Sequence, residues 1–486
     1  MQSAHRKMRP KSSRLGEVGA HNAAMQVIVL GPTGGPREDR ITSLLVRSTS
    51  TDWSSGSVIS VDAGTLLCGI IHALELKDRG PFAGLSLPNE SARANAVHIV
   101  REIIGAVLIT HPHLDHLSGF FISTPVLEAG SEPKPLAGLP SVIGAIKKHL
   151  FNDVIWPNLS DEDGGAGLVT YQRLIEGGNP RMGRGHELGY YRACNGLLVK
   201  CLGISHGKCM KRHPPESTNP SQSNSVNYAP VPGEVGDAGT LYGMSPSFST
   251  ETHTTIDSSA FFIRDHTTGR EILIFGDVEP DSLSLNPRNK HVWYTTAPKI
   301  VNSDLRAIFI ECSYNDGTED CVLYGHLCPR HLIKELLVLA HRVFALKNPE
   351  QIPGDKRKRP STPNMTGSQM IGKRAKSVPQ HNLQGQSANP VTRTRSSSRR
   401  PSSGMGLDSL EISSNDPTTD HLTDVPWQSE DPPLHGLHIW VMHIKDNMTD
   451  GPPPGDRILR ELREQADQAG LGCSFQIPSR GESIWL

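Results

Sequence analysis

The chain has 486 residues, and 49 Lys and Arg against 50 Asp and Glu leave a formal net charge of −1. This balance excludes a strong global attraction to nucleic acid or to an anionic membrane surface. No apolar stretch approaches the roughly 20 residues of a membrane span, and the basic N-terminus lacks the apolar core of a signal peptide. We therefore expect neither nucleic acid nor a membrane as a partner.

Short apolar runs bounded by Gly, Pro or Asp predict strands in the first third of the chain, at 26–30, 43–47, 58–61 and 107–110. The glycine-rich turn at 31–36 lacks the Gly-Lys-Ser/Thr ending of a phosphate loop, so we interpret it as a tight strand exit. A helix is predicted at 141–151.

The same patterns predict the remaining elements. Strands are expected at 197–204, 259–263, 271–275, 307–310, 437–444 and 473–477. Helices are expected at 332–342 and 456–468, where apolar residues recur at helical spacing.

Three segments have compositions that oppose packing into a core. They are a basic tail at 1–24, a polar surface insertion at about 211–250 and a Ser/Pro-rich insertion at 351–430, and we expect the first and the last to be disordered. A long insertion adds little closure entropy. The remaining residues, 25–350 and 431–486, are therefore predicted to form one domain.

The cysteines and the short basic runs indicate the cellular compartment of the protein. Eight cysteines are scattered without a Cys-x-x-Cys pair, which is typical of reduced intracellular thiols. We expect a cytoplasmic protein, and the short basic run Lys356–Arg359 leaves nuclear access open.

The most informative motif is His-Pro-His-Leu-Asp-His at residues 111–116. It places His111, His113, Asp115 and His116 within six residues, directly after an apolar run. A lone histidine is usually a surface or core residue, but borderline metals such as zinc prefer imidazole nitrogen with some carboxylate oxygen. This motif therefore predicts ligands for two metal ions.

Three further candidates lie near the ends of other predicted strands. His206 follows 197–204, Asp277 follows 271–275, and His443 lies near the end of 437–444. If these strands run in a common sense, their carboxyl ends meet at one edge, where α/β proteins commonly build ligand sites. We therefore expect these side chains to join the 111–116 cluster.

With these residues the chain resembles the metallo-β-lactamase superfamily, and His111–Phe120 is similar to the signature of its class II 3′,5′-cyclic-nucleotide phosphodiesterases, typified by the low-affinity fungal cAMP enzymes. The similarity spans about 26–345 and 434–486. Further matching segments are Ser205–Gly207, Ser259–Ile263, Ile274–Ser282, Ile310–Tyr314 and Gly325–Leu327. The resemblance implies an α/β fold: a four-layer αββα sandwich of two mixed sheets with outer helices.

The resemblance also implies a site with two divalent metal ions, which we expect to be Zn²⁺. One ion would be held by His111, His113 and His206, the other by Asp115, His116 and His443, and Asp277 would bridge them. The implied reaction is hydrolysis of a 3′,5′-cyclic nucleotide to the 5′-monophosphate by a hydroxide that bridges the metals. We expect cAMP to be the preferred substrate. Such an enzyme attenuates cAMP signalling.

Several residues near the site have open roles. We expect Asp115 and His326 to be catalytic, with His326 as the leaving-group acid or a phosphate ligand; a polar histidine beside a helix is the alternative. Glu311 is either an orienting carboxylate or a structural one. Asp62 is interpreted as a turn residue, although it could orient a ligand histidine. Glu279 and Asp281 either orient ligand histidines or place charge in the first turn of a helix after Asp277, and we favour the second interpretation.

Two other functions remain open: another phosphodiester hydrolase on the same fold, such as a tRNA 3′-processing nuclease, or a non-catalytic interaction protein stabilised by metal. The insertion at 351–430 is either a plain solvated linker or a regulatory segment. Arg399-Arg400-Pro401-Ser402 and Lys358-Arg359-Pro360-Ser361 place Ser402 and Ser361 in patterns similar to the preference of cAMP-dependent kinases. Such a kinase is therefore an expected partner.

Overall fold

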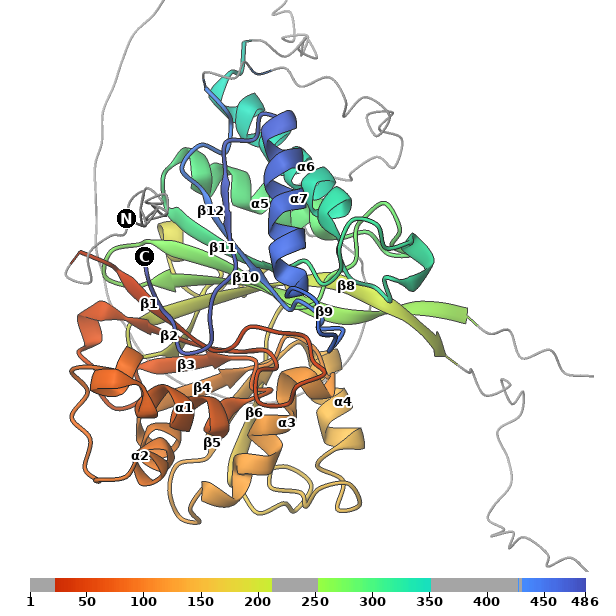
Figure 1. Cartoon of the computed structure of the whole chain (residues 1–486). Helices are drawn as coiled ribbons and strands as arrows, with labels where there is room; N and C mark the ends of the chain where they lie inside the picture. Colours follow the sequence, from red (N-terminus) through yellow and green to blue (C-terminus); the bar gives the residue numbers. More distant parts are fainter. Residues whose placement is uncertain (1–21, 212–251, 351–426, 428–430) are drawn as a thin grey trace, which may run out of the picture. The chain divides into compact units, whose positions relative to one another are not determined.

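Two seven-stranded mixed β-sheets lie face to face, and helices cover the outer side of each sheet (Figure 1). The computed structural model describes residues 22–211, 252–350, 427 and 431–486. The predicted metallo-β-lactamase-like αββα sandwich is confirmed. None of the helices in these described residues is long and apolar enough to cross a membrane.

The first sheet comes mostly from the N-terminal part of the chain. In spatial order its strands are β14 (Ser483–Trp485), β1 (Met25–Gly31), β2 (Ser43–Ser48), β3 (Val58–Val61), β4 (Ile104–Leu108), β5 (Lys134–Gly138) and β6 (Val169–Arg173). The strands from β3 to β6 pair in parallel, and those from β14 to β3 pair antiparallel. Its helices are α1 (Leu66–Glu75), α2 (Ala92–His98), α3 (Leu114–Ser123) and α4 (Pro140–His149).

The second sheet repeats this plan. In spatial order its strands are β13 (Ser474–Gln476), β12 (His438–Met442), β11 (Leu305–Glu311), β10 (Glu271–Phe275), β9 (Thr252–Asp265), β8 (Leu197–Lys211) and β7 (Tyr191–Cys194). Strands β10 to β13 pair in parallel, and β7 to β10 pair antiparallel. Its helices are α5 (Asn289–Val301), α6 (Pro329–Lys347) and α7 (Pro454–Gln468).

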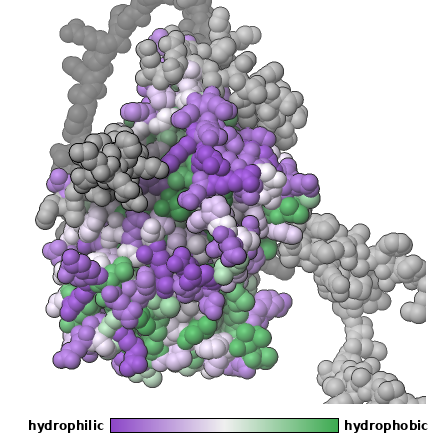
Figure 2. All heavy atoms as spheres, viewed as in Figure 1, coloured by the Kyte–Doolittle hydropathy of each residue, from purple (hydrophilic) through white to green (hydrophobic). Residues whose placement is uncertain are grey.

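Alternating side chains of the second sheet serve two different cores, because successive strand residues point to opposite faces. On β9, Phe261 and Ile263 pack between the two sheets, whereas Phe262 packs under α5 to α7. Helix α7 buries Ile458, Leu462 and Ala466, which recur every four residues, and its outer side is hydrophilic (Figure 2). Both faces of this sheet are thus covered, which explains its nearly continuous apolar strands.

The predicted strands and helices are present in the described residues, with shifted ends. Strands 58–61 and 271–275 match β3 and β10, but the strand predicted at 107–110 is β4 at Ile104–Leu108. The prediction missed α1, α2, α3, α5, β5, β6, β7 and β14. The predicted tail and the two predicted insertions, with Ser361 and Ser402, lie almost wholly outside the described residues.

Candidate metal centre

Both sheets contribute to a single cluster of histidines and carboxylates. From the first sheet come the loop after β4 and the first turn of α3, and from the second come β8 and the residues just after β10 and β12. Strands β8, β10 and β12 run in the same direction, since β8 and β10 are each antiparallel to β9 and β10 to β12 are parallel. The ligand candidates of these strands therefore meet at one edge, as the sequence analysis expects.

One position differs from the sequence prediction. His206 does not follow the end of a strand, because β8 continues to Lys211. It lies where the pairing with β9 shifts by one residue, and Gly207 after it has a φ of 62°. Bulges re-aim side chains next to active sites. This bulge accounts for a ligand candidate inside a long strand.

The seven predicted ligands fall into two groups that share Asp277. Within each group the ligand atoms lie within 4.8 Å of one another. The first group is His111, His113, His206 and Asp277, and the second is Asp115, His116, Asp277 and His443. The two groups match the two ligand sets that the sequence resemblance implies.

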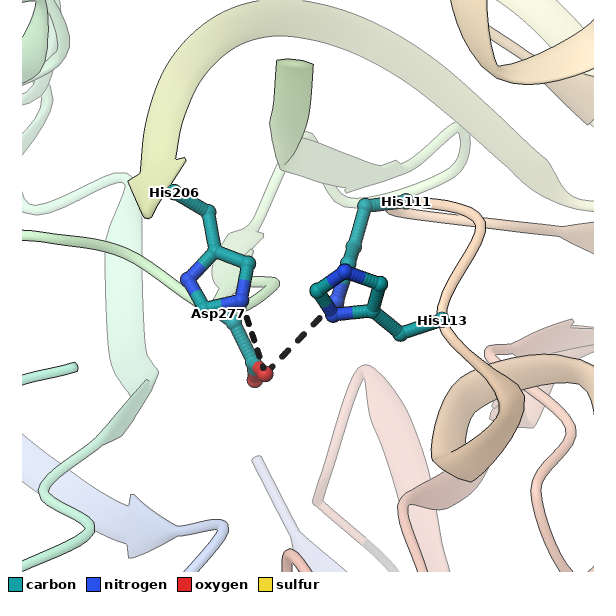
Figure 3. Close-up of side chains that lie close together, drawn as sticks. All are labelled: His111, His113, His206 and Asp277. Atoms are coloured by element: carbon teal, nitrogen blue, oxygen red, sulfur yellow. Dashed lines mark ion pairs between the residues drawn. The ribbon is translucent and has the colours of Figure 1, made fainter. Parts of the chain in front are cut away.

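In the first group the imidazoles lie on the same side of the Asp277 carboxylate, and two of them are paired with it (Figure 3). The Oδ2 atom of Asp277 lies 3.6 Å from His111 Nε2 and 3.8 Å from His206 Nε2. In the second group, Asp277 Oδ1 lies 3.2 Å from His116 Nε2, and His443 Nε2 lies 3.2 Å from Asp115 Oδ2. Asp277 thus faces both groups.

The opposite ring nitrogens bond to the protein, which fixes how the rings face. His206 Nδ1 donates to the carbonyl of Gly325 at 2.8 Å, because a carbonyl only accepts. His111 Nδ1 lies 3.1 Å from the Thr110 hydroxyl, and His443 Nδ1 lies 3.1 Å from Ser313 Oγ. Such partners fix the tautomer and leave Nε2 free to bind a metal.

Asp62 corrects the sequence interpretation. It does sit in a turn, with a φ of 54°, but its Oδ2 also lies 2.7 Å from His116 Nδ1. The backbone N–H and hydroxyl of Thr110 donate to the same carboxylate, at 2.8 and 2.9 Å. Asp62 therefore orients His116 in addition to forming the turn.

The donor set fits a bound cation. His111 Nε2 is buried, and among the described residues it has no hydrogen-bond partner. Burial lowers the pKa of His111 well below its usual range and that of His206 to about 4, so both rings are neutral, the form that binds metal. Burial opposes a charge on His116 as well, but Asp277 and Asp62 raise its pKa well above normal. The two carboxylates therefore favour a positive charge at His116.

His326 lies beside the seven residues rather than apart from them. Its Nδ1 is 3.0 Å from Glu311 Oε1 and 3.7 Å from Asp277 Oδ2, and the side chain is buried. Burial lowers the pKa of His326 to about 4, whereas burial and the charge of Asp277 raise that of Glu311 to about 7. Glu311 is thus both buried and bonded to His326.

The interpretation of Asp281 was partly wrong. No helix starts directly after Asp277; the next one, α5, begins at Asn289. The Asp281 carboxylate nevertheless caps that helix, because it accepts hydrogen bonds from the backbone N–H groups of 288, 289 and 290, each at 2.9 Å. Glu279 accepts a 2.5 Å hydrogen bond from Ser284 Oγ.

Three supporting contacts of the site were not predicted from the sequence. The backbone of Gly34 packs against the ring of His443, and a Cβ there would lie 2.4 Å from that ring. Lys445 Nζ lies 3.9 Å from Asp115 Oδ2 and donates to the Gly34 carbonyl at 3.0 Å. Ser313 donates to the His443 carbonyl. The turn at 31–36 is therefore a strand exit that also supports the site.

Comparisons with known proteins agree with this geometry. A family model described as class II cAMP phosphodiesterases matches residues 27–397 and 419–481. The 3′,5′-cyclic-nucleotide phosphodiesterase of Schizosaccharomyces pombe is 30% identical over 330 residues, which cover 66% of this chain and 77% of that protein. The chain belongs to the class II cAMP phosphodiesterase family. The enzyme class predicted from the sequence, a 3′,5′-cyclic-nucleotide phosphodiesterase, is thereby confirmed.

Two other relatives support the family and the fold. A probable 3′,5′-cyclic-nucleotide phosphodiesterase of Yersinia pestis is 27% identical over 314 residues, or 65% of this chain and 72% of that protein. The crystal structure of unliganded yeast PDE1 matches with a TM-score of 0.58 at 19% identity, over 96% of this chain and 100% of that chain. The likeness to PDE1 supports the fold of the enzyme.

Asp62 provides a test of how the ligand cluster would hold a metal ion. Replacing Asp62 with Ala removes the carboxylate that orients His116, so we expect the metal affinity to fall about 10–100-fold. The measurement is metal content by mass spectrometry after competition with a graded chelator. The control is Asp265→Ala, which removes a buried carboxylate bonded to the Ser48 hydroxyl and should lower stability only. Equal metal retention by Asp62→Ala and the wild type would refute the orienting role.

Proposed function

We propose that this enzyme hydrolyses cAMP to 5′-AMP with two divalent cations, Zn²⁺ in the native protein. The proposal depends most directly on Asp277, whose two oxygens face both ligand groups. His111, His113 and His206 would hold one cation, and Asp115, His116 and His443 the other. Bound there, a pair of cations would lower the pKa of water toward about 7 and neutralise charge on the phosphoryl group.

The substrate would lie in a cavity of about 600 Å³ beside this centre, which is lined by His113, His206 and His326 among others. Small-molecule sites usually measure about 300–1,000 Å³. A phosphodiester placed at the histidine end would meet the ligand cluster, and the nucleoside would occupy the rest of the cavity. The protein's own contribution is to orient the phosphorus and exclude bulk water.

His326 is our proposed source of the proton for the departing 3′ oxygen. Glu311 has a pKa raised to about 7, so the Glu311–His326 pair carries a transferable proton near neutral pH. When Nε2 of His326 gives its proton to the 3′ oxygen, Nδ1 takes the proton of the pair from Glu311. The transfer keeps His326 neutral at both ends of the step, in agreement with its low pKa.

The first test is turnover. With cAMP or cGMP, the purified enzyme should form the 5′-monophosphate, and a chelator should abolish this activity until a divalent metal is restored. Asp277→Ala should lose activity by a factor of at least about 10⁴, since it removes the group shared by both metal sites, while circular dichroism stays native. Persistent turnover in the chelated enzyme or in Asp277→Ala would contradict the proposal.

His326→Gln tests the proton donor separately. We expect kcat to fall about 10²–10⁴-fold with the metal content unchanged, because the substitution removes a proton donor but none of the seven proposed ligands. His291→Gln is the control, since His291 lies on the exposed side of α5. Loss of metal from His326→Gln would instead make His326 a ligand.

The location and regulation of the enzyme are also part of the proposal. We infer that it acts in the cytoplasm to attenuate cAMP signals and that a kinase activated by cAMP phosphorylates Ser402 or Ser361. Phosphate there would add negative charge to a basic segment and alter its contacts. Incubating the full-length enzyme with the cAMP-dependent kinase and radiolabelled ATP should label Ser402, Ser361 or both in wild type and neither position in the double Ser→Ala variant. Unlabelled wild-type protein would end this part of the proposal.

A further inference from the structure

The cavity beside the ligand cluster has a lining of two chemical kinds. His113, His206 and His326 lie at the proposed metal centre. The rest of the lining includes the apolar side chains of Ile256, Pro280, Leu283 and Leu323, the ring of Tyr324, and the polar side chains of Glu279, Asp320 and Cys321. An apolar region next to a polar centre suits a flat organic group attached to a phosphate.

Tyr324 is unusual in its exposure and in its backbone. Its side chain is 72% exposed, although aromatic rings contribute most to stability when they are buried. Its φ is 51°, in the left-handed region that non-glycine residues seldom occupy. A strained, exposed residue at a ligand cavity indicates a functional constraint rather than a packing one.

The contacts around Tyr324 explain how this conformation is held. Gly325 has a φ of 84°, and a Cβ on it would lie 2.3 Å from the backbone of Gly207, so only glycine fits at this point of contact. The Gly325 carbonyl accepts from His206 Nδ1, and the His326 N–H donates to the Leu323 carbonyl at 3.0 Å. The backbone around Tyr324 is thus fixed by the same contacts that orient His206 and His326.

The shape of the substrate then places its base near Tyr324. In a 3′,5′-cyclic nucleotide the phosphate is fused to the ribose, and the base projects from the opposite side of the sugar. With the phosphorus at the three histidines, the base extends into the rest of the cavity, whose lining includes Tyr324. We propose that Tyr324 stacks on this base and makes the enzyme favour purine over pyrimidine cyclic nucleotides, an inference that rests on the proposed function.

The loss of base stacking should have a measurable effect on KM. Stacking on an aromatic side chain stabilises a bound base, and the larger purine ring gains more than a pyrimidine. The interaction is present in substrate and transition state alike, so its loss should raise KM and leave kcat nearly unchanged. A merely structural role would lower turnover of every substrate equally.

The experiment compares steady-state kinetics of wild type, Tyr324→Ala and Tyr324→Phe on cAMP, cGMP, cCMP and cUMP. For Tyr324→Ala we expect KM for the purine substrates to rise about tenfold with kcat within about twofold, and little change for the pyrimidines. Tyr324→Phe should behave like wild type, because it keeps the ring. The control is Tyr294→Ala on α5, an exposed tyrosine that does not line the cavity.

Equilibrium binding of 5′-AMP and 5′-CMP keeps the two proposals separable. Wild type should bind 5′-AMP the more tightly, and Tyr324→Ala should lose that preference. If the wild-type enzyme turns over no cyclic nucleotide yet shows this binding pattern, the proposed function fails and the stacking role stands. If Tyr324→Ala keeps the purine preference in both measurements, or loses activity on purines and pyrimidines alike, the stacking role is wrong.

Discussion

One buried carboxylate governs the arrangement of the site. Asp277 is 2% exposed, and its oxygens lie 3.2–3.8 Å from the Nε2 atoms of four histidines. An unpaired buried carboxylate costs several kcal/mol, so this position requires positive charge beside it. Neighbouring His116 and His443 hold the pKa of Asp277 well below its usual range despite burial, which by itself would raise it. A pair of bound cations would meet the same requirement more completely.

The two sheets are joined at one edge, and this joint brings histidines from both sheets beside Asp277. The backbone N–H of His443, just after β12, donates to the Pro32 carbonyl at 2.7 Å, and the N–H of Gly34 donates to the Ile444 carbonyl at 3.3 Å. These bonds join the exit of β1 in the first sheet to the exit of β12 in the second. His443 has a φ of 56°, and such local strain persists where surrounding contacts over-determine it. The glycine at 34 is needed because the imidazole occupies the space of a side chain.

The ligand residues of the site could be predicted from the sequence more completely than the strands and helices around them. The strands were predictable because their apolar runs are short and end at Gly, Pro or Asp. Helices α3 and α5 were not, since α3 begins inside the ligand motif and α5 contains Pro298. Asp62 was read as a turn because its contact with His116 joins residues 54 apart in the chain. Tertiary contacts of this kind, such as those of Gly34 and Lys445, leave no local pattern, whereas ligand spacing does.

The loop between β11 and α6 contains the residues of both the proposed proton transfer and the proposed base contact. Its Gly325 carbonyl fixes the tautomer of His206, its His326 pairs with Glu311, and its Tyr324 reaches the cavity. These three residues are consecutive, so none of them can move without disturbing the others. A substitution at Gly325 would therefore push the loop away from Gly207 and alter the orientation of His206 together with the proposed proton transfer and base contact. Such coupling makes a change of base preference hard to separate from a loss of turnover at Gly325 and His326. The side chain of Tyr324 is 72% exposed, so its replacement is the change in this loop that alters the proposed base contact alone.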